Sequence, residues 1–547
     1  MRCLEKDKEK RCQSAGELRS VLADIEKGIP TSEKVIPKRK PITSKEITVT
    51  FGLKKLLIPI LVIVSLAIIA VVISQLLPQK ETFFPPTEKG SIAVLPFEDL
   101  SPQKDQGHLC DGFAESIINA LTRVEDLRVV ASASSFSFKG KELDMQDIGE
   151  KLRVKTLLRG SVQKVGNMVR ITAQLINVAE ESLLWSAQYN RELDDIFAIQ
   201  DGITIAIVDN LKVKLLGKER VELIKRYTDN PDAYDLYLQG RFHWNKRSGE
   251  GMLKSIEYFK KAIEMDSTYA LAYAGLADSY IVLGEWGVFS SMEVYPKAKD
   301  AALRALEIDD GLAEAHNALA MIKRDYDWDW EAAEREFKRA IELNPNYPTA
   351  HQWYAEYLAM MGRFDEAIIE IERAQDLDPL SLVMKAIGGY VFHFSRQYDQ
   401  GIEQCQKVLD LNPSYIPAHI YLGRNYLSKG MHEEAIAEFQ KALDLSEGLL
   451  LISQSHLGYA YAASDKRDEA QKTLDQLDER SKQSYVRPST FAFVYQGLGE
   501  NDRVFELLEK GYKEKDIWLA FLKVNPLYDS IRSDPRFKAL LKKMNFE

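Results

Sequence analysis

A repeat of 34 residues constrains the fold of this chain more than any other feature of its sequence. Three columns of small or apolar residues keep this period, namely Ala333, Ala367, Gly401 and Ala435, then Phe337, Ile371, Cys405 and Phe439, then Ala340, Ala374, Val408 and Ala442. Pro345, Pro379 and Pro413 keep it as well, and proline ends a helix because it lacks a backbone donor. The pattern predicts stacked helix pairs that cross closely at the small residues.

These columns resemble tetratricopeptide repeats, in which each unit is a helix pair of the same length. Weaker units precede and follow the clear ones, so the resemblance implies an all-α superhelix of about eight to nine repeats over residues 232–547. The stretch from Asn525 to Phe546 is expected to cap its C-terminal end. The acidic and aromatic stretch from Asp325 to Trp330 predicts a connection between helices, with Asp329 as the N-cap of the next helix.

Arrays of this kind bind proteins or peptides on a concave face that the first helix of each repeat lines. Helical phase puts four polar residues on that face, and we predict them as a partner-binding patch: Asn317, Gln352, Glu356 and Arg424. His316, His351 and His419 recur at the position of the consensus tryptophan. We predict that these histidines pack between helices rather than act in catalysis or metal binding.

The run from Leu56 to Leu77 carries no charge. A helix of this length rises about 33 Å, which matches the roughly 30 Å hydrocarbon core of a bilayer. We therefore predict a single transmembrane helix over residues 53–77, with a juxtamembrane linker at 29–52 and a second linker at 78–90. A buried helix of a soluble domain is the alternative, but such helices are usually shorter and carry a polar face.

Basic residues crowd the N-terminal side of this run and are sparse on the other side. The positive-inside rule then predicts a cytoplasmic N-terminus and extracytoplasmic C-terminal domains. In the leading hypothesis given below, the membrane is the inner membrane of a bacterium. Ala70 and Ser74 form a small-xxx-small pair of the kind that supports helix dimerisation. A homodimer is therefore one expectation for the oligomeric state.

Charge is divided unevenly along the chain. The net charge is −10, and residues 1–55 carry 14 basic and 8 acidic side chains, a balance of +6, which leaves −16 for the remainder. Nucleic-acid binding needs clustered positive charge, so we expect protein partners and no nucleic acid. The four cysteines, Cys3, Cys12, Cys110 and Cys405, show neither a disulfide framework nor metal-ligand spacing.

Residues 91–213 predict a small α/β domain, followed by a linker helix at 214–231. A strand is expected at 91–97, a helix with Asp111 as its N-cap, a strand at 127–131 and a helix at 144–152. Strands at 156–165 and 168–178 flank Gly166-Asn167, which is typical of a tight hairpin turn. A strand near Trp185 and a helix from Ile196 to about Leu211 complete the unit.

The amino-acid sequence of this segment resembles that of the TolB-like amino-terminal domain, which is related to the FlgO family. The residues that carry the likeness include Ile92 to Phe97, Asp111-Gly112, Ser134 to Phe136, Gly160 to Val162, Arg170 to Leu175, and Leu184-Trp185. The resemblance implies a non-catalytic sensing or assembly module. His108, Cys110 and Asp111 are close in sequence, and we interpret them as part of a loop leading into a helix rather than a metal or thiol site.

Residues 1–28 resemble the last turns of the C-lobe of bacterial serine/threonine kinases of the eukaryotic type. The matching residues are Leu4, Glu5, Lys6, Asp7, Lys10, Arg11, Gln13, Ser14 and Leu18. The chain has no glycine-rich loop, H-R-D or D-F-G motif, so nothing in it could hold ATP and magnesium. As written it is not expected to be an enzyme, and we predict no catalytic residue, cofactor or metal site.

The leading hypothesis is a single-pass membrane protein that acts in signalling or as a scaffold through its repeat array. One alternative is the regulatory tail of a transmembrane serine/threonine kinase whose catalytic domain is missing from this chain. A second alternative is a protein that assembles on the cell envelope. The fold class expected in all three cases is one transmembrane helix, a small α/β domain and an all-α superhelix.

Overall fold

The structure, a computed structural model, describes residues 90–546 except 142–143, 193–194, 214–222, 224, 247, 447 and 449. The predicted membrane span at 53–77, the linker at 29–52 and the segment 1–28 lie outside the described residues, as does most of the predicted linker helix at 214–231. In the part of the chain that is described, no helix is both long enough and apolar enough to span a bilayer.

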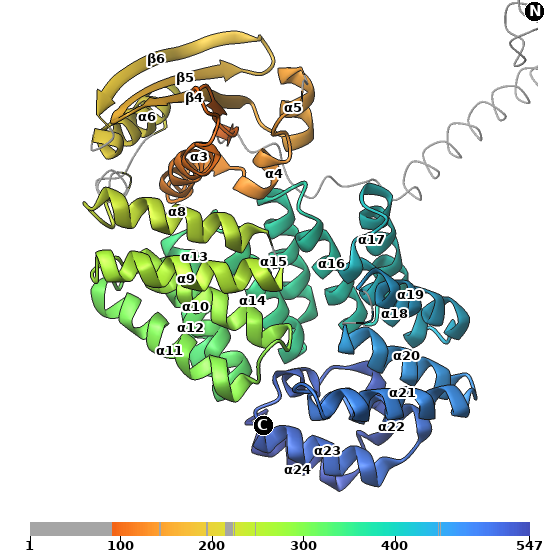
Figure 1. The fold of residues 1–547 in the computed structure, drawn as a ribbon. Helices are drawn as coiled ribbons and strands as arrows, with labels where there is room; N and C mark the ends of the chain where they lie inside the picture. Colours follow the sequence, from red (N-terminus) through yellow and green to blue (C-terminus); the bar gives the residue numbers. More distant parts are fainter. Residues whose placement is uncertain are drawn as a thin grey trace, which may run out of the picture. The chain divides into compact units, whose positions relative to one another are not determined.

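The first described part, here called the sheet domain (residues 90–213), is built on a mixed sheet (Figure 1). Its strands are β1 Gly90–Val94, β2 Glu98–Asp99, β3 Leu127–Val129, β4 Thr156–Val165, β5 Met168–Asn177 and β6 Ser182–Glu192. Their order is β3-β1-β4-β5-β6, with β2 paired to β4. β1 runs parallel to β3 and β4, whereas β4, β5 and β6 form an antiparallel meander.

The predicted hairpin is present, with Val165 opposite Met168 and φ of +61° at Gly166. Such a φ is easy for glycine, which has no Cβ. On β5, Val169, Ile171 and Ala173 are buried in the core while the residues between them are more exposed. The alternation of apolar and polar residues in the sequence therefore fixes which face of this hairpin is covered.

Helices cover both faces of the sheet. They are α3 Gly107–Leu121, α4 Ser132–Phe136, α5 Met145–Leu152 and α6 Ile196–Asn210. Ile92 and Val94 of β1 belong to the core that α3 and α6 share, and Ala93 belongs to a second core with Ile148 and Leu152 of α5. Asp144 caps α5 by accepting from the Gln146 amide.

The prediction that Asp111 is the N-cap of a helix is wrong. Helix α3 begins five residues earlier than predicted, at Gly107, and Gln106 is the residue at its N-cap position. The cause is Asp99, whose carboxylate accepts from the amides of Ser101 and Gln106 and so orders the loop before the helix. Asp111 lies inside α3, where its carboxylate pairs with Lys139 at 2.6 Å.

The second part, here called the repeat array (residues 231–546), contains eight helix pairs among its described residues. The pairs are α8 Pro231–Asn245 with α9 Gly249–Met265, α10 Ala270–Glu285 with α11 Ser291–Ile308, α12 Ala313–Ile322 with α13 Trp330–Leu343, and α14 Pro348–Met361 with α15 Phe364–Leu377. They continue with α16 Leu382–Phe394 and α17 Tyr398–Leu411, α18 Ile416–Ser428 and α19 His432–Leu445, α20 Leu451–Ala463 and α21 Arg467–Ser481, and α22 Pro488–Leu498 and α23 Asn501–Lys513. Figure 1 shows the pairs stacked in chain order.

The columns of the 34-residue repeat lie where the helices cross. Phe337, Cys405 and Phe439 are fully buried. A Cβ added to Gly389 would lie 2.4 Å from the Cys405 sulfur, so the two helices of that pair approach as closely as a glycine allows. The periodicity in the sequence is thus the periodicity of the helix contacts.

One repeat contains an additional residue. Ala333 follows His316 by 17 residues, whereas Ala367 follows His351 by only 16. Helix α12 ends in a π-helical turn, Lys323–Asp327, and Trp328 after it has a φ of +54°. Because a π turn contains one more residue than an α turn, it absorbs the insertion without changing the phase of the helices that follow. Asp329 then caps α13, as predicted, by accepting from the Ala332 amide at 3.2 Å.

Candidate functional site

The predicted partner-binding patch is not an accessible surface in this structure. The relative exposures of its four residues are Asn317 0%, Gln352 6%, Glu356 8% and Arg424 4%. Gln352 donates to Glu356 at 2.9 Å, and Glu356 lies 3.6 Å from Arg324, which the π turn buries beside Asp325. All four residues are buried, and no local pattern in the sequence indicated what covers them.

Over Arg424 the cover is a segment from the far end of the same chain, the 3-10 turn η5 Ile517–Phe521. The Arg424 guanidinium lies 5.2 Å from the Trp518 ring, and its Nε donates to Nε2 of His456 at 3.0 Å. Phe521 stacks on Phe394 with ring centroids 5.0 Å apart. This part of the inner face is therefore filled by the protein itself.

The C-terminal end of the array is fastened to its N-terminal half by contacts that we call the clasp. The clasp joins Arg487, Tyr512, Met544, Asn545 and Phe546 to Glu285, Trp328 and Trp330. Trp330 stacks on Phe546 with centroids 4.4 Å apart and donates to the Met544 carbonyl at 2.7 Å. Trp328 stacks on Tyr512, its carbonyl accepts from Asn545, and Arg487 donates to the Glu285 carbonyl at 3.0 Å.

A cavity of about 530 Å³ remains open nearer the start of the array. Its walls come from the first helices α8, α10, α12, α14 and α16 on one side and from α3 and α4 of the sheet domain on the other. Tyr237 and Trp244 of α8 and Tyr347 supply aromatic surface. A cavity of this size between two parts of a protein is the usual setting of a ligand site.

Charged groups in this cavity are mostly acidic. Among the lining residues, Glu115, Asp278, Glu314 and Asp378 face a single base, Arg241. The Arg241 guanidinium lies 3.3 Å from the Glu115 carboxylate and 4.5 Å from the centre of the Trp244 ring. Burial lowers the pKa of Arg241, but Glu115 and Tyr237 outweigh it and raise the pKa above its ordinary value. Arg241 is therefore a permanent cation already held by one of the four acids.

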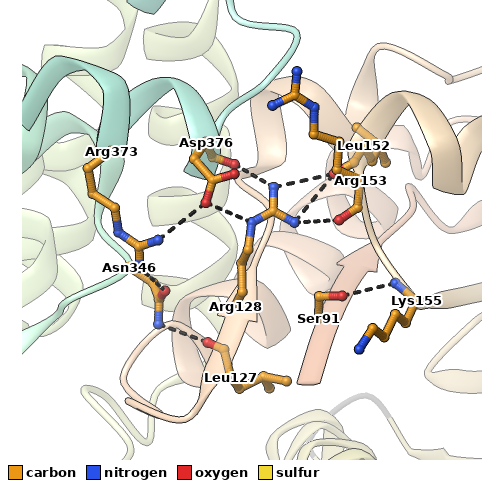
Figure 2. A network of polar contacts seen from close by, with 9 residues as sticks. All are labelled: Ser91, Leu127, Arg128, Leu152, Arg153, Lys155, Asn346, Arg373 and Asp376. Carbon is orange, nitrogen blue, oxygen red and sulfur yellow. Dashed lines mark hydrogen bonds and ion pairs between the residues drawn. The ribbon is translucent and has the colours of Figure 1, made fainter. Parts of the chain in front are cut away.

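The sheet domain is attached to the array by a polar network that we call the joint, shown in Figure 2. At its centre Arg128 of β3 donates to the Asp376 carboxylate at 3.0 Å and to the Asp376 carbonyl at 2.5 Å. The same guanidinium donates to the Arg153 carbonyl at 2.7 Å. Arg373 also lies 3.3 Å from the Asp376 carboxylate, so this acid meets two cations.

Two successive connections between helix pairs form the array's side of the joint. In the first, Nδ2 of Asn346 donates to the carbonyls of Thr122 and Leu127, each at 3.0 Å. In the second, Asp378 accepts from the backbone amide of Ser134 at 3.0 Å and from its hydroxyl. Burial raises the pKa of Asp378, and the bonds from Ser134 oppose that rise. Ser134 is thus a contact between the two parts.

The repeated histidines are structural, as predicted. His316, His351 and His419 each bond through Nδ1 to a glutamate of the paired helix, at 2.5, 2.6 and 2.5 Å. Nε2 of each ring bonds to a backbone carbonyl six residues earlier. In the unit that lies between those of His351 and His419, Lys385 takes the place of the histidine and bonds to the Pro379 carbonyl in the same way. This position therefore ties each first helix to the connection that precedes it.

His108, Cys110 and Asp111 do not form a site. His108 pairs with Asp235 at 3.1 Å, Asp111 pairs with Lys139, and Cys110 is buried, which raises its pKa to about 12. Within the described ranges no group of His, Cys, Asp and Glu side chains is arranged to hold a metal ion. No pattern in the sequence pointed to Arg128, Asn346 or Arg241, because their partners are distant in the chain.

Three segments of the chain match models of known protein families. Residues 87–206 match the family model of the HilA/YgeH-like transcriptional regulator second domain. Residues 329–386 and 416–449 match models of the tetratricopeptide repeat. The resemblance to a TolB-like or FlgO-related domain is therefore corrected, because the matching model over that segment is that of the HilA/YgeH-like regulators.

Two named proteins are similar in sequence to parts of this chain. The chain is 34% identical over 288 residues to the "Putative adenylate cyclase 3" of Rhizobium meliloti (strain 1021), covering 51% of this chain and 42% of that protein. It is 25% identical over 148 residues to the "Transcriptional regulator HilA" of Salmonella typhimurium, covering 27% of each. The chain thus spans less than half the length of these relatives. Because they are not kinases, the interpretation of residues 1–28 as a kinase remnant is corrected as well.

Two solved structures resemble parts of this chain. A pilF structure from Pseudomonas aeruginosa covers 39% of this chain and 94% of its own at 21% identity, with a TM-score of 0.29. A human IFIT1 dimer covers 59% of this chain and 86% of its own at 14% identity, with a TM-score of 0.40. At these scores the likeness carries no argument about ligands or assembly.

Proposed function

We propose that this chain is a non-catalytic signalling adaptor that binds a protein partner across its sheet domain and repeat array. The observation that carries this proposal is the cavity between α3 and α4 of the sheet domain and the first helices of the array. In tetratricopeptide proteins these first helices line the surface that receives partners. Here the C-terminal part of that surface is filled by η5, so the open cavity is the place for a partner.

The joint supports the same function because it makes two parts act as one binding unit. A partner in the cavity touches the sheet domain and the array together, so its binding depends on how the two are held. Relatives named as a putative adenylate cyclase and as a transcriptional regulator support a role in signalling. In such proteins the same unit would serve outputs that lie elsewhere in a longer chain.

We propose in addition that the chain is anchored in the inner membrane by the apolar run Leu56–Leu77, with its N-terminus in the cytoplasm. The basic flank before this run supports the orientation. Fusion of alkaline phosphatase and of a fluorescent reporter after Glu547 tests it in cells. Phosphatase activity without fluorescence is the expected result, and the reverse pattern would overturn the orientation while leaving the adaptor function untouched.

Site-specific photocrosslinking in cells tests the adaptor function. A photoreactive amino acid at Asn245, which is exposed at the edge of the cavity, is expected to give one dominant protein adduct. The matched control carries the same amino acid at Glu257, which is exposed on the second helix α9. Equal adducts from both positions, or none from Asn245, would contradict partner binding at the cavity.

A further inference from the structure

The two edges of the sheet differ in what covers them. At the β3 edge the repeat array supplies contacts, because the Ala131 amide donates to the Leu377 carbonyl and Arg128 bonds to the array as well. β6 is the strand at the opposite edge, and among the described residues no strand pairs with its outer side. An open edge of this kind presents a row of N–H and C=O groups with which another strand can pair.

The hydrogen bonds of the inner strands show which residues of β6 face that outer side. The Leu158 carbonyl of β4 accepts from the Leu95 amide, on the side of β4 away from β5. Main-chain groups alternate between the two sides of a strand. Followed through the registers of β4 with β5 and of β5 with β6, this alternation directs the N–H and C=O of Ala187 toward β5. Its neighbours Ser186 and Gln188, which are exposed, therefore direct theirs outward.

The usual protection of an edge strand is missing here. Natural edge strands are guarded by charged side chains or proline, and residues 185–190 of β6 contain neither. A register shift between β5 and β6 lies just before Trp185 and bounds this segment on one side, and Arg191 bounds it on the other. The open edge is thus a short, regular and uncharged strand.

The side chains of this segment are complementary to a second copy of themselves. Trp185, Ala187 and Tyr189 lie on one face of β6, and both aromatic rings are half-buried against the core. If two copies pair antiparallel about a two-fold axis at Ala187, Trp185 of each copy lies opposite Tyr189 of the other. Aromatic residues opposite each other on neighbouring strands stabilise a sheet. Ala187 lies opposite itself, where its small side chain leaves room for the four rings.

The same register also satisfies the main chain. Ser186 of each copy lies opposite Gln188 of the other, and both residues have their N–H and C=O groups directed outward. Two such residues exchange both of their hydrogen bonds. Their polar side chains lie on the face of β6 opposite Trp185, where no charged side chain opposes another.

We propose that the outer edge of β6 is an interface between two copies of this chain, which pair antiparallel along residues 185–189 about a two-fold axis at Ala187. The symmetric pairing of Trp185 with Tyr189 is what identifies a second copy as the occupant, because a strand of another sequence would not reproduce it. The inference goes beyond the proposed function, since β6 does not line the cavity. A dimer presents two cavities, so a partner with two copies of the same motif is held at two points.

Cysteine crosslinking of the full chain, purified in mild detergent, tests the inference. The background carries Cys3→Ser and Cys12→Ser, and the remaining two cysteines are buried. Ala187→Cys places a thiol at the two-fold axis, where the Cα atoms of the pair lie about 4.5 Å apart, within the range of a disulfide. Oxidation by copper phenanthroline is expected to give a covalent dimer. Gln188→Cys, one residue further along the same edge, is the matched control and should give none, because its thiol does not face its own copy.

A proline at the edge separates strand pairing from random collision. The Gln188 amide faces outward, so Gln188→Pro removes a bond of the dimer but none of the sheet. Added to Ala187→Cys, Gln188→Pro should abolish the covalent dimer, whereas Gln188→Ala should retain it. Thermal unfolding of both variants is measured in parallel and is expected to show an intact sheet domain.

Three results would overturn the inference. They are equal crosslinking of Ala187→Cys and Gln188→Cys, no crosslinking of Ala187→Cys, and a covalent dimer that persists when Gln188→Pro is added. If Gln188→Pro does not fold, the comparison of the two cysteine variants decides alone. None of these results bears on the photocrosslinking at Asn245, so failure of this inference is distinct from failure of the adaptor function.

Discussion

The indole N–H of Trp330 donates a 2.7 Å hydrogen bond to the backbone carbonyl of Met544, a residue 214 positions further along the chain. Trp330 is 6% exposed and stacks on Phe546. Trp330→Phe keeps an aromatic ring but removes the indole N–H, so the buried carbonyl of Met544 loses its hydrogen-bond donor. We expect the free energy of unfolding to fall by about 1–2 kcal/mol, measured by urea denaturation.

A matched substitution controls for the loss of an indole ring elsewhere. Trp286 is 42% exposed, so Trp286→Phe should change stability by less than about 0.5 kcal/mol. Equal destabilisation by the two variants would show that the clasp contributes nothing specific to the stability of the array.

Arg128 is the centre of the joint, and its side chain is only 10% exposed. Arg128→Ala leaves several carbonyls without their donor and the Asp376 carboxylate with Arg373 alone, so we expect a loss of about 3–5 kcal/mol. Because the lost contacts join two parts, calorimetry should resolve two transitions where the unmodified chain gives one. Arg170→Ala is the control, since Arg170 is exposed on β5 and bonds to Asn190 across the sheet. A single unshifted transition in Arg128→Ala would contradict the joint.

The buried, neutral ring of His456 predicts that the folded protein loses stability at acidic pH. Its Nε2 accepts from Arg424 and its Nδ1 bonds to the Ile452 carbonyl, which requires the neutral ring. Burial, with Arg424 as a second cause, lowers its pKa well below the ordinary value. The unfolded chain therefore binds a proton below about pH 6.5 that the folded chain excludes. Stability contributed by this residue should fall as the pH drops below that value.

The surroundings of His316 predict the opposite dependence of stability on pH. Burial lowers its pKa, but the Glu336 carboxylate and the Asp310 carbonyl raise it above the ordinary value, because both accept from the ring. Its stabilising contribution is complete below about pH 6.5 and is lost as the pH rises through the raised pKa. Urea denaturation across the range about pH 5.5–8 should give a shallower rise of stability with pH in His456→Gln and a steeper one in His316→Gln. Parallel curves for the two variants would contradict both assignments.

Gly389 allows α16 and α17 to pack closely because it has no side chain. The Cβ of Gly389→Ala would lie 2.4 Å from the Cys405 sulfur, so we expect a loss of about 1–3 kcal/mol. Adding Cys405→Ala should restore part of it, which a double-mutant cycle measures as a coupling. Gly202→Ala in α6 is the control, because its nearest neighbour lies at 3.5 Å. Absence of coupling between Gly389 and Cys405 would contradict the close approach.

The sequence was informative where a structure repeats or alternates over a short distance. The alternation from Val169 to Leu175 predicted the buried face of the hairpin, and the columns through Phe337 and Phe439 predicted the helix contacts of the array. In each case the partners lie within one or two elements, so the local pattern contains the information.

Contacts between distant segments could not be predicted in this way. Trp518 reaches Arg424, and Asn346 reaches the Leu127 carbonyl, across long stretches of chain without any shared period. The one available signal was the change in spacing between His316 and Ala333, which marks the π turn. That shift buries Arg324 and Asp325, and it was readable only once the regular repeats had been aligned.

The clasp changes how the array responds to load. An open stack of helix pairs behaves as a spring, since each unit contacts only its neighbours and the end units fray first. Here the last helices are fastened to Glu285, Trp328 and Trp330, so the terminal units have no free end from which to peel. A force that pulls on the C-terminus must therefore break the aromatic contacts of the clasp before it can bend a single repeat. The clasp in this way keeps the curvature of the array constant.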